Sequence, residues 1–197
     1  MKAVRIKQQK QIRAFLIEEF GADRARALSE KQENILYALI ENAKEWSKSR
    51  KASLTHTILP CIALYRVLLE ECTSKEEAYV RMRKYMLEKV AAGTHKSMVR
   101  MEAMPGFYAM YSRGFVSVVR KTDLWESTQR RSRDFFDVTI RKCLWHTACR
   151  ENGCAELCRL FCEADDVTYG GLKKIGFSRT KTLGGGGDCC DFHFYRK

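Results

Sequence analysis

The residues best suited to chemistry lie near the C-terminus, on both sides of four consecutive glycines at residues 184–187. Arg179 precedes this run, and two adjacent cysteines, Cys189 and Cys190, follow it. Alternating apolar and polar residues on each side predict two strands of a β-hairpin joined through the glycines. Glycine suits such a loop where the backbone needs a positive φ or approaches another group closely.

The twofold period of a strand assigns these side chains to faces. Cys190 and the two phenylalanines that alternate with it fall on an apolar face, whereas Asp191 and His193 share the opposite face. Arg179 has the parity of the apolar residues before the loop. Its guanidinium therefore either meets a carboxylate, a phosphate or a ligand anion inside, or reaches solvent through a twist or bulge.

The chain has nine cysteines, and its N-terminus lacks the apolar core of a secretion signal, so we expect a cytoplasmic protein with reduced thiols. Cys154, Cys158 and Cys162 recur at helical spacing, which predicts a buried stripe of thiols that pack as small apolar side chains. No Cys-x-x-Cys pair occurs, so packing is favoured over a metal site. We predict no cofactor, with zinc or manganese as the alternative.

A reactive thiol is a further interpretation. The amides of the glycine run could lower a thiol pKa or hold an anion, and Cys189, on the polar face, is then the better nucleophile. His193 lies roughly 13 Å further along an extended strand, too far for direct pairing with Cys189. Asp165 follows Cys162 near the end of a predicted helix, where the helix dipole disfavours negative charge, and functional residues often violate such local rules.

The order of helix and strand patterns along the chain predicts an α+β fold. An N-terminal helical half is followed by an antiparallel sheet with short helices. Residues 106–134 leave helix and strand open. We expect a single domain over residues 1–197, with a helical part at 1–105 and an α+β part at 106–197 that carries the C-terminal hairpin. Periodicity, capping patterns and helix breakers predict the individual elements. In the helical part, helices are expected over residues 2–19, from Ser29, from Thr57 and from Ser74 to Gly93. In the α+β part, a strand is expected around residues 136–140, and two short helices between Cys143 and Cys162, broken at Asn152 and Gly153.

The net charge of +12 favours anionic partners. The densest basic cluster, Arg130, Arg131 and Arg133, is short, and no nucleic-acid-binding motif accompanies it. A solvated basic face is therefore the first interpretation and a small anionic substrate the second, with no specific nucleic acid. No run approaches the length of a membrane span, so no membrane is expected. A homo-oligomer stays open.

With these residues in view, the chain resembles the L-2-amino-thiazoline-4-carboxylic acid hydrolase-like family. The resemblance runs from about Leu59 to the end, and rests on the motifs LPCIALYR at residues 59–66, Glu77-Ala78, CEAD at residues 162–165 and, most specifically, RTKTLGGGGDCCDF from Arg179. A weaker likeness is to 4-vinyl-reductase-type small-molecule-binding domains, which also pair a late cysteine-rich helix with a closing strand.

The resemblance implies a hydrolase that opens a sulfur-containing five-membered ring. The family's namesake opens such a ring and gives N-carbamoyl-L-cysteine. Such chemistry needs a base for water, an acid or cation for the leaving sulfur, and an anchor for the carboxylate. On this hypothesis Arg179 is the anchor and Asp165 or Asp191 the base. Cys190 or Cys162 lines the pocket or acts covalently.

Gly186, Gly187 and His193 complete the expected substrate contacts. The competing interpretation is a non-enzymatic sensor or binding module that holds a small anion in the same pocket. Turnover of thiazoline acids separates the two classes.

Overall fold

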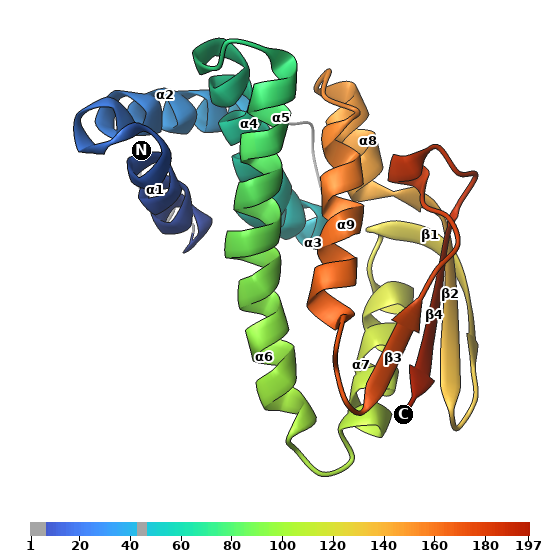
Figure 1. Ribbon diagram of the computed structural model, residues 1–197. Helices are drawn as coiled ribbons and strands as arrows, with labels where there is room; N and C mark the ends of the chain where they lie inside the picture. Colours follow the sequence, from blue (N-terminus) through green and yellow to red (C-terminus); the bar gives the residue numbers. More distant parts are fainter. Residues whose placement is uncertain (1–6, 43–46) are drawn as a thin grey trace. The chain divides into compact units, whose positions relative to one another are not determined.

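The computed structural model describes residues 7–42 and 47–197 (Figure 1). The chain divides into two compact units, Met1–Tyr85 and Met86–Lys197, which we call unit 1 and unit 2. Helices predominate in the first half and a four-stranded antiparallel sheet follows, which confirms the α+β class. The expectation of a single domain stays a prediction.

Unit 1 is helical. Its most buried segment is α4, in which the residues from Leu59 to Leu68 are buried except Arg66. Apolar residues surround this helix on all sides, which is typical of a helix at the centre of a core. The elements are α1 (Lys7–Phe20), α2 (Ala22–Glu41), α3 (Lys48–Ser53), η1 (Leu54–Ile58, a π-helical turn), α4 (Leu59–Glu71) and α5 (Lys75–Lys84).

The continuous helical run Lys48–Glu71 corrects one expectation. Its 24 residues are long and apolar enough to cross a membrane, whereas the sequence indicated no run of that length. Two thirds of its most apolar window, 67%, is buried inside the protein. The buried core helix of a soluble protein meets the same criteria of length and composition.

Helix boundaries in unit 1 depend on burial as well as on capping patterns. Gly21 has the positive φ, 76°, expected of the residue that ends α1. Ser29 and Gln32, however, do not start a helix as predicted, because both are buried inside α2. The Gln32 side chain instead donates to the Pro60 carbonyl of α4 at 3.2 Å, so tertiary contacts use the residues of this apparent cap.

The next helical run also begins earlier than predicted, at Lys48 and not at Thr57. Ser47 is the reason, because its Oγ accepts the backbone N–H of Arg50 at 3.2 Å and caps the first turn. The polar run at residues 47–51 therefore opens a helix.

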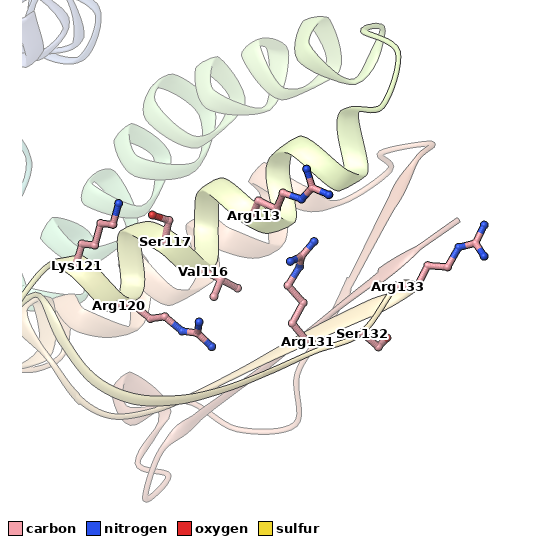
Figure 2. Close-up of a pocket in the computed structure, with 8 residues that line it drawn as sticks. All are labelled: Arg113, Val116, Ser117, Arg120, Lys121, Arg131, Ser132 and Arg133. Atoms are coloured by element: carbon pink, nitrogen blue, oxygen red, sulfur yellow. The ribbon is translucent and has the colours of Figure 1, made fainter.

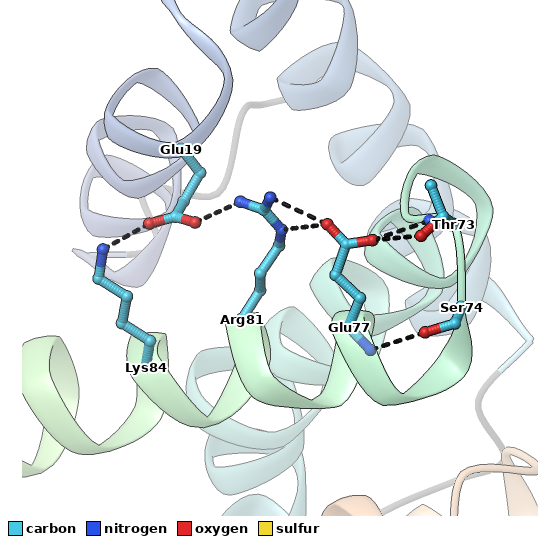
Figure 3. Close-up of polar contacts among 6 residues, drawn as sticks. All are labelled: Glu19, Thr73, Ser74, Glu77, Arg81 and Lys84. Atoms are coloured by element: carbon cyan, nitrogen blue, oxygen red, sulfur yellow. Dashed lines mark hydrogen bonds and ion pairs between the residues drawn. The ribbon is translucent and has the colours of Figure 1, made fainter.

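The predicted capping box at the start of α5 is confirmed, and it extends into an ionic network (Figure 3). Ser74 Oγ accepts the N–H of Glu77 at 3.1 Å, and the Glu77 carboxylate accepts the N–H of Thr73 at 3.0 Å. Arg81, one turn later, donates both to Glu77 and to Glu19 of α1. The cap thus also ties α5 to α1 within unit 1.

In unit 2, residues 106–134, for which the sequence left helix and strand open, form a helix followed by a strand. Helix α6 continues through Gly93, where a break was predicted, because a single glycine costs a helix only about 1 kcal/mol. The break comes instead at Pro105 and Gly106, and the predicted break at Asn152 and Gly153 is confirmed. After η2 (Tyr85–Ala91) the elements are α6 (Ala92–Glu102), α7 (Phe107–Lys121), β1 (Trp125–Arg131), β2 (Phe135–Cys143), α8 (Leu144–Glu151), α9 (Leu157–Tyr169), β3 (Ile175–Ser178), η3 (Leu183–Gly185, a 3-10 turn) and β4 (Cys190–Arg196).

The sheet has the strand order β1-β2-β4-β3, and every neighbouring pair is antiparallel. The predicted hairpin is therefore present as β3 and β4, with Phe177 opposite Phe194. Phe194 is fully buried, and its ring contacts Tyr111 of α7 and Tyr169 of α9. Both helices thus pack on one face of the sheet, and the core of unit 2 lies between them and the strands.

Candidate functional site

Arg179, the residue that follows β3, points inward. Its side chain is only 11% exposed, and its guanidinium lies over the Phe177 and Phe192 rings at 5.6 and 5.9 Å from their centroids. Nη2 donates to the Cys162 carbonyl at 2.7 Å and to the Asp166 carboxylate at 2.5 Å. Of the two alternatives that the sequence left open, the structure has the guanidinium inside and paired with a carboxylate.

The second terminal nitrogen of Arg179, Nη1, is buried and makes no hydrogen bond to any residue that the structure describes. The Asp165 carboxylate lies 3.5 Å from it and supplies charge compensation. A buried donor without an acceptor is costly in a folded protein. Nη1 is therefore a donor that lacks an acceptor within the described structure.

Asp165, on α9, has a carboxyl group whose pKa is raised to about 7. Burial among protein atoms disfavours its charged form, and the nearby Arg179 only partly offsets this effect. The side chain still keeps 35% of its surface exposed. Asp165 can therefore both donate and accept a proton near neutral pH.

Two tyrosines extend this polar region into the core. The Tyr111 and Tyr169 hydroxyls lie 2.6 Å apart, and Tyr169 follows Asp165 by one helical turn. Burial raises the pKa of both phenols, and the charge of Asp165 contributes to the increase. The tyrosine pair thus stays protonated and supplies hydrogen-bond donors behind the carboxylate.

Cys162 lies at the centre of a thiol cluster. Hydrogen bonds from the Cys158 and Cys190 thiols, then from the Thr182 hydroxyl, together with the charge of Arg179, lower its pKa. The same interactions and burial raise the pKa values of Cys158 and Cys190. Cys162 is therefore the thiol of the cluster that ionises most readily, and the thiolate is the nucleophilic form of cysteine.

The glycine loop approaches Cys162 closely. A Cβ atom at Gly184 would lie 2.9 Å from Cys162 Sγ, so only glycine fits there, and Gly186 has a φ of 88°. The amides at residues 185–187 donate to carbonyl oxygens at the start of the same loop, at 2.9–3.2 Å. The loop thus covers the thiol, and these amides are used within it and not turned toward an anion.

An open hollow of about 590 Å³ gives access to Cys162 and Arg179. This volume is within the range of small-molecule sites. Asp165 lies outside the lining and meets the hollow only through Arg179. The lining residues are Arg159, Cys162, Glu163, Arg179, Thr180, Lys181, Thr182, Gly185, Gly186 and Gly187.

Asp191 has a role in the loop. Its carboxylate accepts the N–H groups of Thr180 and Lys181 at 3.0 and 2.8 Å, and also the Thr180 hydroxyl. Although burial alone would raise its pKa, these bonds lower it overall. A carboxylate held in its charged form by three donors is a poor base, and Asp191 instead positions the segment after Arg179.

His193 lies on the outer face of the sheet, away from the apolar face that carries Cys190. Its Nδ1 lies 2.6 Å from Asp137 Oδ1, and Asp137 also pairs with Arg130 at 2.9 Å. The opposite faces expected for Cys190 and His193 are thus observed. The structure therefore brings Cys162, Cys190, Asp165 and Arg179 together, but not His193.

Sequence reasoning missed Tyr111, Tyr169 and Thr182. A signal existed for Tyr169, which stands four residues after Asp165 and so shares its helix face. No local signal pointed to Tyr111, because it lies in the segment where helix and strand stayed open.

All nine cysteines lie in the described part of the chain and none forms a disulfide. Within residues 7–42 and 47–197, no three His, Cys, Asp or Glu side chains are grouped so as to hold a metal ion. The alternative of zinc or manganese stays a question for assay.

The sequence of this chain is also similar to a family of known proteins. The sequence model of the L-2-amino-thiazoline-4-carboxylic acid hydrolase family matches residues 51–194, a span that includes Cys162, Asp165, Arg179 and the glycine loop. No curated protein and no solved structure matches the chain. Because the matched span covers well over half of the sequence, the chain belongs to the L-2-amino-thiazoline-4-carboxylic acid hydrolase family.

Proposed function

We propose that this protein hydrolyses a small carboxylated thiazoline or a related sulfur-containing ring. The observation that carries the proposal is the hollow lined by both Cys162 and Arg179, which places a thiol of lowered pKa near a guanidinium that has one unused donor. The family name supports the same substrate class.

The overall reaction adds one water to L-2-amino-thiazoline-4-carboxylate and gives N-carbamoyl-L-cysteine. The ring carbon between nitrogen and sulfur gains the water oxygen as a carbonyl, the carbon–sulfur bond breaks, and the sulfur leaves as a thiol. That carbon is amidine-like and electrophilic, and the substrate carboxylate is the handle by which a cation can orient the ring.

In the proposed mechanism the Cys162 thiolate attacks this carbon, and the ring sulfur leaves as its bond to the carbon breaks. The leaving sulfur takes a proton that originates from Asp165, whose pKa of about 7 keeps part of it protonated at neutral pH. Because Asp165 lies outside the lining of the hollow, one water molecule carries this proton in the proposed mechanism. Water then attacks the same carbon, gives one proton back to Asp165 and the other to the former ring nitrogen, and releases Cys162 as a thiolate. A thiol of lowered pKa serves both as nucleophile and as leaving group.

Arg179 holds the substrate carboxylate through Nη1, which has no hydrogen-bond partner in the described structure and becomes accessible when the side chains that cover it move. Its other bonds, to the Cys162 carbonyl and Asp166, fix the guanidinium before substrate arrives. Gly186 and Gly187 form a wall of the hollow beside this anchor. The proposal includes a reducing, cytoplasmic location, which keeps the thiols of the cluster reduced.

The test is turnover of L-2-amino-thiazoline-4-carboxylate in reductant, with N-carbamoyl-L-cysteine detected by mass spectrometry, on chelator-treated protein and on protein supplied with zinc or manganese. Cys162→Ala should lower kcat at least about a thousandfold, because no nucleophile remains. Arg179→Gln should mainly raise KM. Cys72→Ala, a half-buried thiol in unit 1, is the matched control and should keep full activity.

Intact-protein mass spectrometry of a quenched reaction should show an adduct of substrate mass on the wild type and none on Cys162→Ala. Full activity of Cys162→Ala would disprove the covalent mechanism. Ligand binding without turnover under every metal condition would replace the hydrolase proposal by a binding or sensor module.

A further inference from the structure

A second hollow of unit 2 has a strongly basic lining. It lies between α7 and the end of β1, and its volume is about 600 Å³ (Figure 2). Five exposed cations and no carboxylate line it, and none of its residues lines the hollow at Cys162. The lining residues are Arg113, Val116, Ser117, Arg120, Lys121, Arg131, Ser132 and Arg133.

Arg131 projects into the gap between the helix and the strand, whereas Arg133 lies beyond the end of β1 and points away from α7 (Figure 2). Figure 2 shows the Arg131 side chain directed from β1 toward α7, with Arg113 and Arg120 on the helix nearby. Arg120 is held by a bond from Nε to Gln129 Oε1 at 3.1 Å. Like charges placed together in this way repel one another unless an anion lies between them.

The lining cations have no acidic partners among the described residues. Arg113, Arg131 and Arg133 form no ion pair within residues 7–42 and 47–197, whereas Arg130, the neighbour of Arg131 on β1, pairs with Asp137 at 2.9 Å. The contrast is local, because adjacent residues of one strand point to opposite faces. The paired arginine lies on the face of Asp137, and the unpaired arginine faces the hollow.

A neighbouring hollow of about 460 Å³ continues this basic surface. It shares Arg133 with the first hollow and adds Lys174, Arg196 and Lys197, again without an acidic side chain. Its lining includes Tyr108, which is 8% exposed and whose hydroxyl has no hydrogen-bond partner in the described part of the chain. The Tyr108 hydroxyl is thus an unused donor at this surface, and after burial the charge of Asp134, the residue that follows Arg133, is the largest cause of its raised pKa.

We propose that these two adjoining hollows bind a small molecule that carries two or more phosphate groups. Arginine forks match phosphate oxygens in geometry and charge, and several of them together neutralise a multiply charged anion. Volumes of this size suit a compact ligand better than a flat strip along a polymer. Arg133 bridges the two halves of the site, so one phosphate lies in each hollow. The site is separate from the proposed hydrolytic centre.

Isothermal titration calorimetry with inorganic tripolyphosphate as the probe tests the proposal, with citrate as a comparison anion. The Arg113→Gln/Arg131→Gln double variant should weaken tripolyphosphate binding about a hundredfold, because each of the two lost charge-assisted bonds costs roughly a factor of ten. Tyr108→Phe should weaken it about threefold. The control, Lys96→Gln/Arg150→Gln, removes the same net charge outside both hollows and should bind as the wild type does.

Circular dichroism first establishes that each variant is folded, and the single exposed substitution Arg133→Gln replaces the double variant if the latter unfolds. Any one of three results would overturn the proposal. The first is an equal loss of affinity in the control variant, which would indicate non-specific charge attraction, and the second is citrate binding as tight as tripolyphosphate binding. The third is a twenty-nucleotide single-stranded RNA that binds more tightly than tripolyphosphate and loses affinity in the double variant.

Discussion

The carboxyl group of Asp165 should make this protein less stable as the pH rises toward neutrality. Its pKa is about 7 in the folded protein, against an ordinary value of 3.8. A carboxyl group with a raised pKa contributes its full stability below the unfolded-state pKa, and that contribution is lost as the pH rises through the folded-state pKa. Asp165→Asn removes this titration. The free energy of unfolding of wild type should therefore fall relative to Asp165→Asn between about pH 4 and pH 7.

The size of this effect follows from the pKa difference and the exposure of the side chain. A shift from 3.8 to about 7 corresponds to about 4 kcal/mol at 1.36 kcal/mol for each pKa unit. Because the side chain is 35% exposed, solvent screens the interaction and the value is an upper limit. After this discount we expect a relative loss of about 1–2 kcal/mol.

Urea unfolding followed by circular dichroism at pH 4, 5, 6, 7 and 8 measures the difference. The free energy of unfolding of Asp165→Asn should rise relative to that of wild type between about pH 4 and pH 7, and the variant should be the more stable protein at pH 8. Asp188→Asn is the control: Lys181 lowers the pKa of Asp188, so its substitution should give no gain toward neutral pH. A constant difference between wild type and Asp165→Asn at all five pH values would refute the raised pKa and, with it, the proton-transfer role.

Three further predictions concern the loop, the thiol and a cap. Gly184→Ala should cost about 1–3 kcal/mol in urea unfolding, because the new methyl group would meet Cys162 Sγ at 2.9 Å; Gly93→Ala, whose added methyl group would have no neighbouring atom within 4 Å, should be neutral or stabilise α6 by about 0.5–1 kcal/mol. Cys162 should be the first thiol alkylated by iodoacetamide at pH 6, as identified by peptide mass spectrometry, and Arg179→Gln should slow its alkylation because one cause of the lowered pKa is lost; equal rates in the two proteins would contradict the electrostatic role of Arg179. Ser74→Ala should destabilise unit 1 by about 1 kcal/mol through loss of the bond to the Glu77 N–H, and an unchanged urea midpoint would show that the cap contributes nothing.

Patterns local in sequence determined much of this site. The twofold period of strands placed Cys190 on the inner face and His193 on the outer face, because alternation of side chains is a property of the extended backbone itself. For Arg179, which follows β3, the same parity left both an inward and a solvent-exposed guanidinium open, and the structure shows the inward one. Helical spacing likewise put Cys158 and Cys162 on one side of α9. The α+β class followed from the same two periodicities, and the capping box at Ser74 from adjacent residues alone.

Burial and long-range contacts decided the rest. Ser29 and Gln32 have the pattern of a helix start, but packing against α4 keeps them inside α2. The pKa of Asp165 and the thiolate character of Cys162 arise where α9, the glycine loop and β4 meet, and no spacing within one element encodes that meeting. The sequence by itself determined which side chains share a face; only the tertiary structure decided which faces meet, because desolvation and charge pairing depend on distances between segments far apart along the chain.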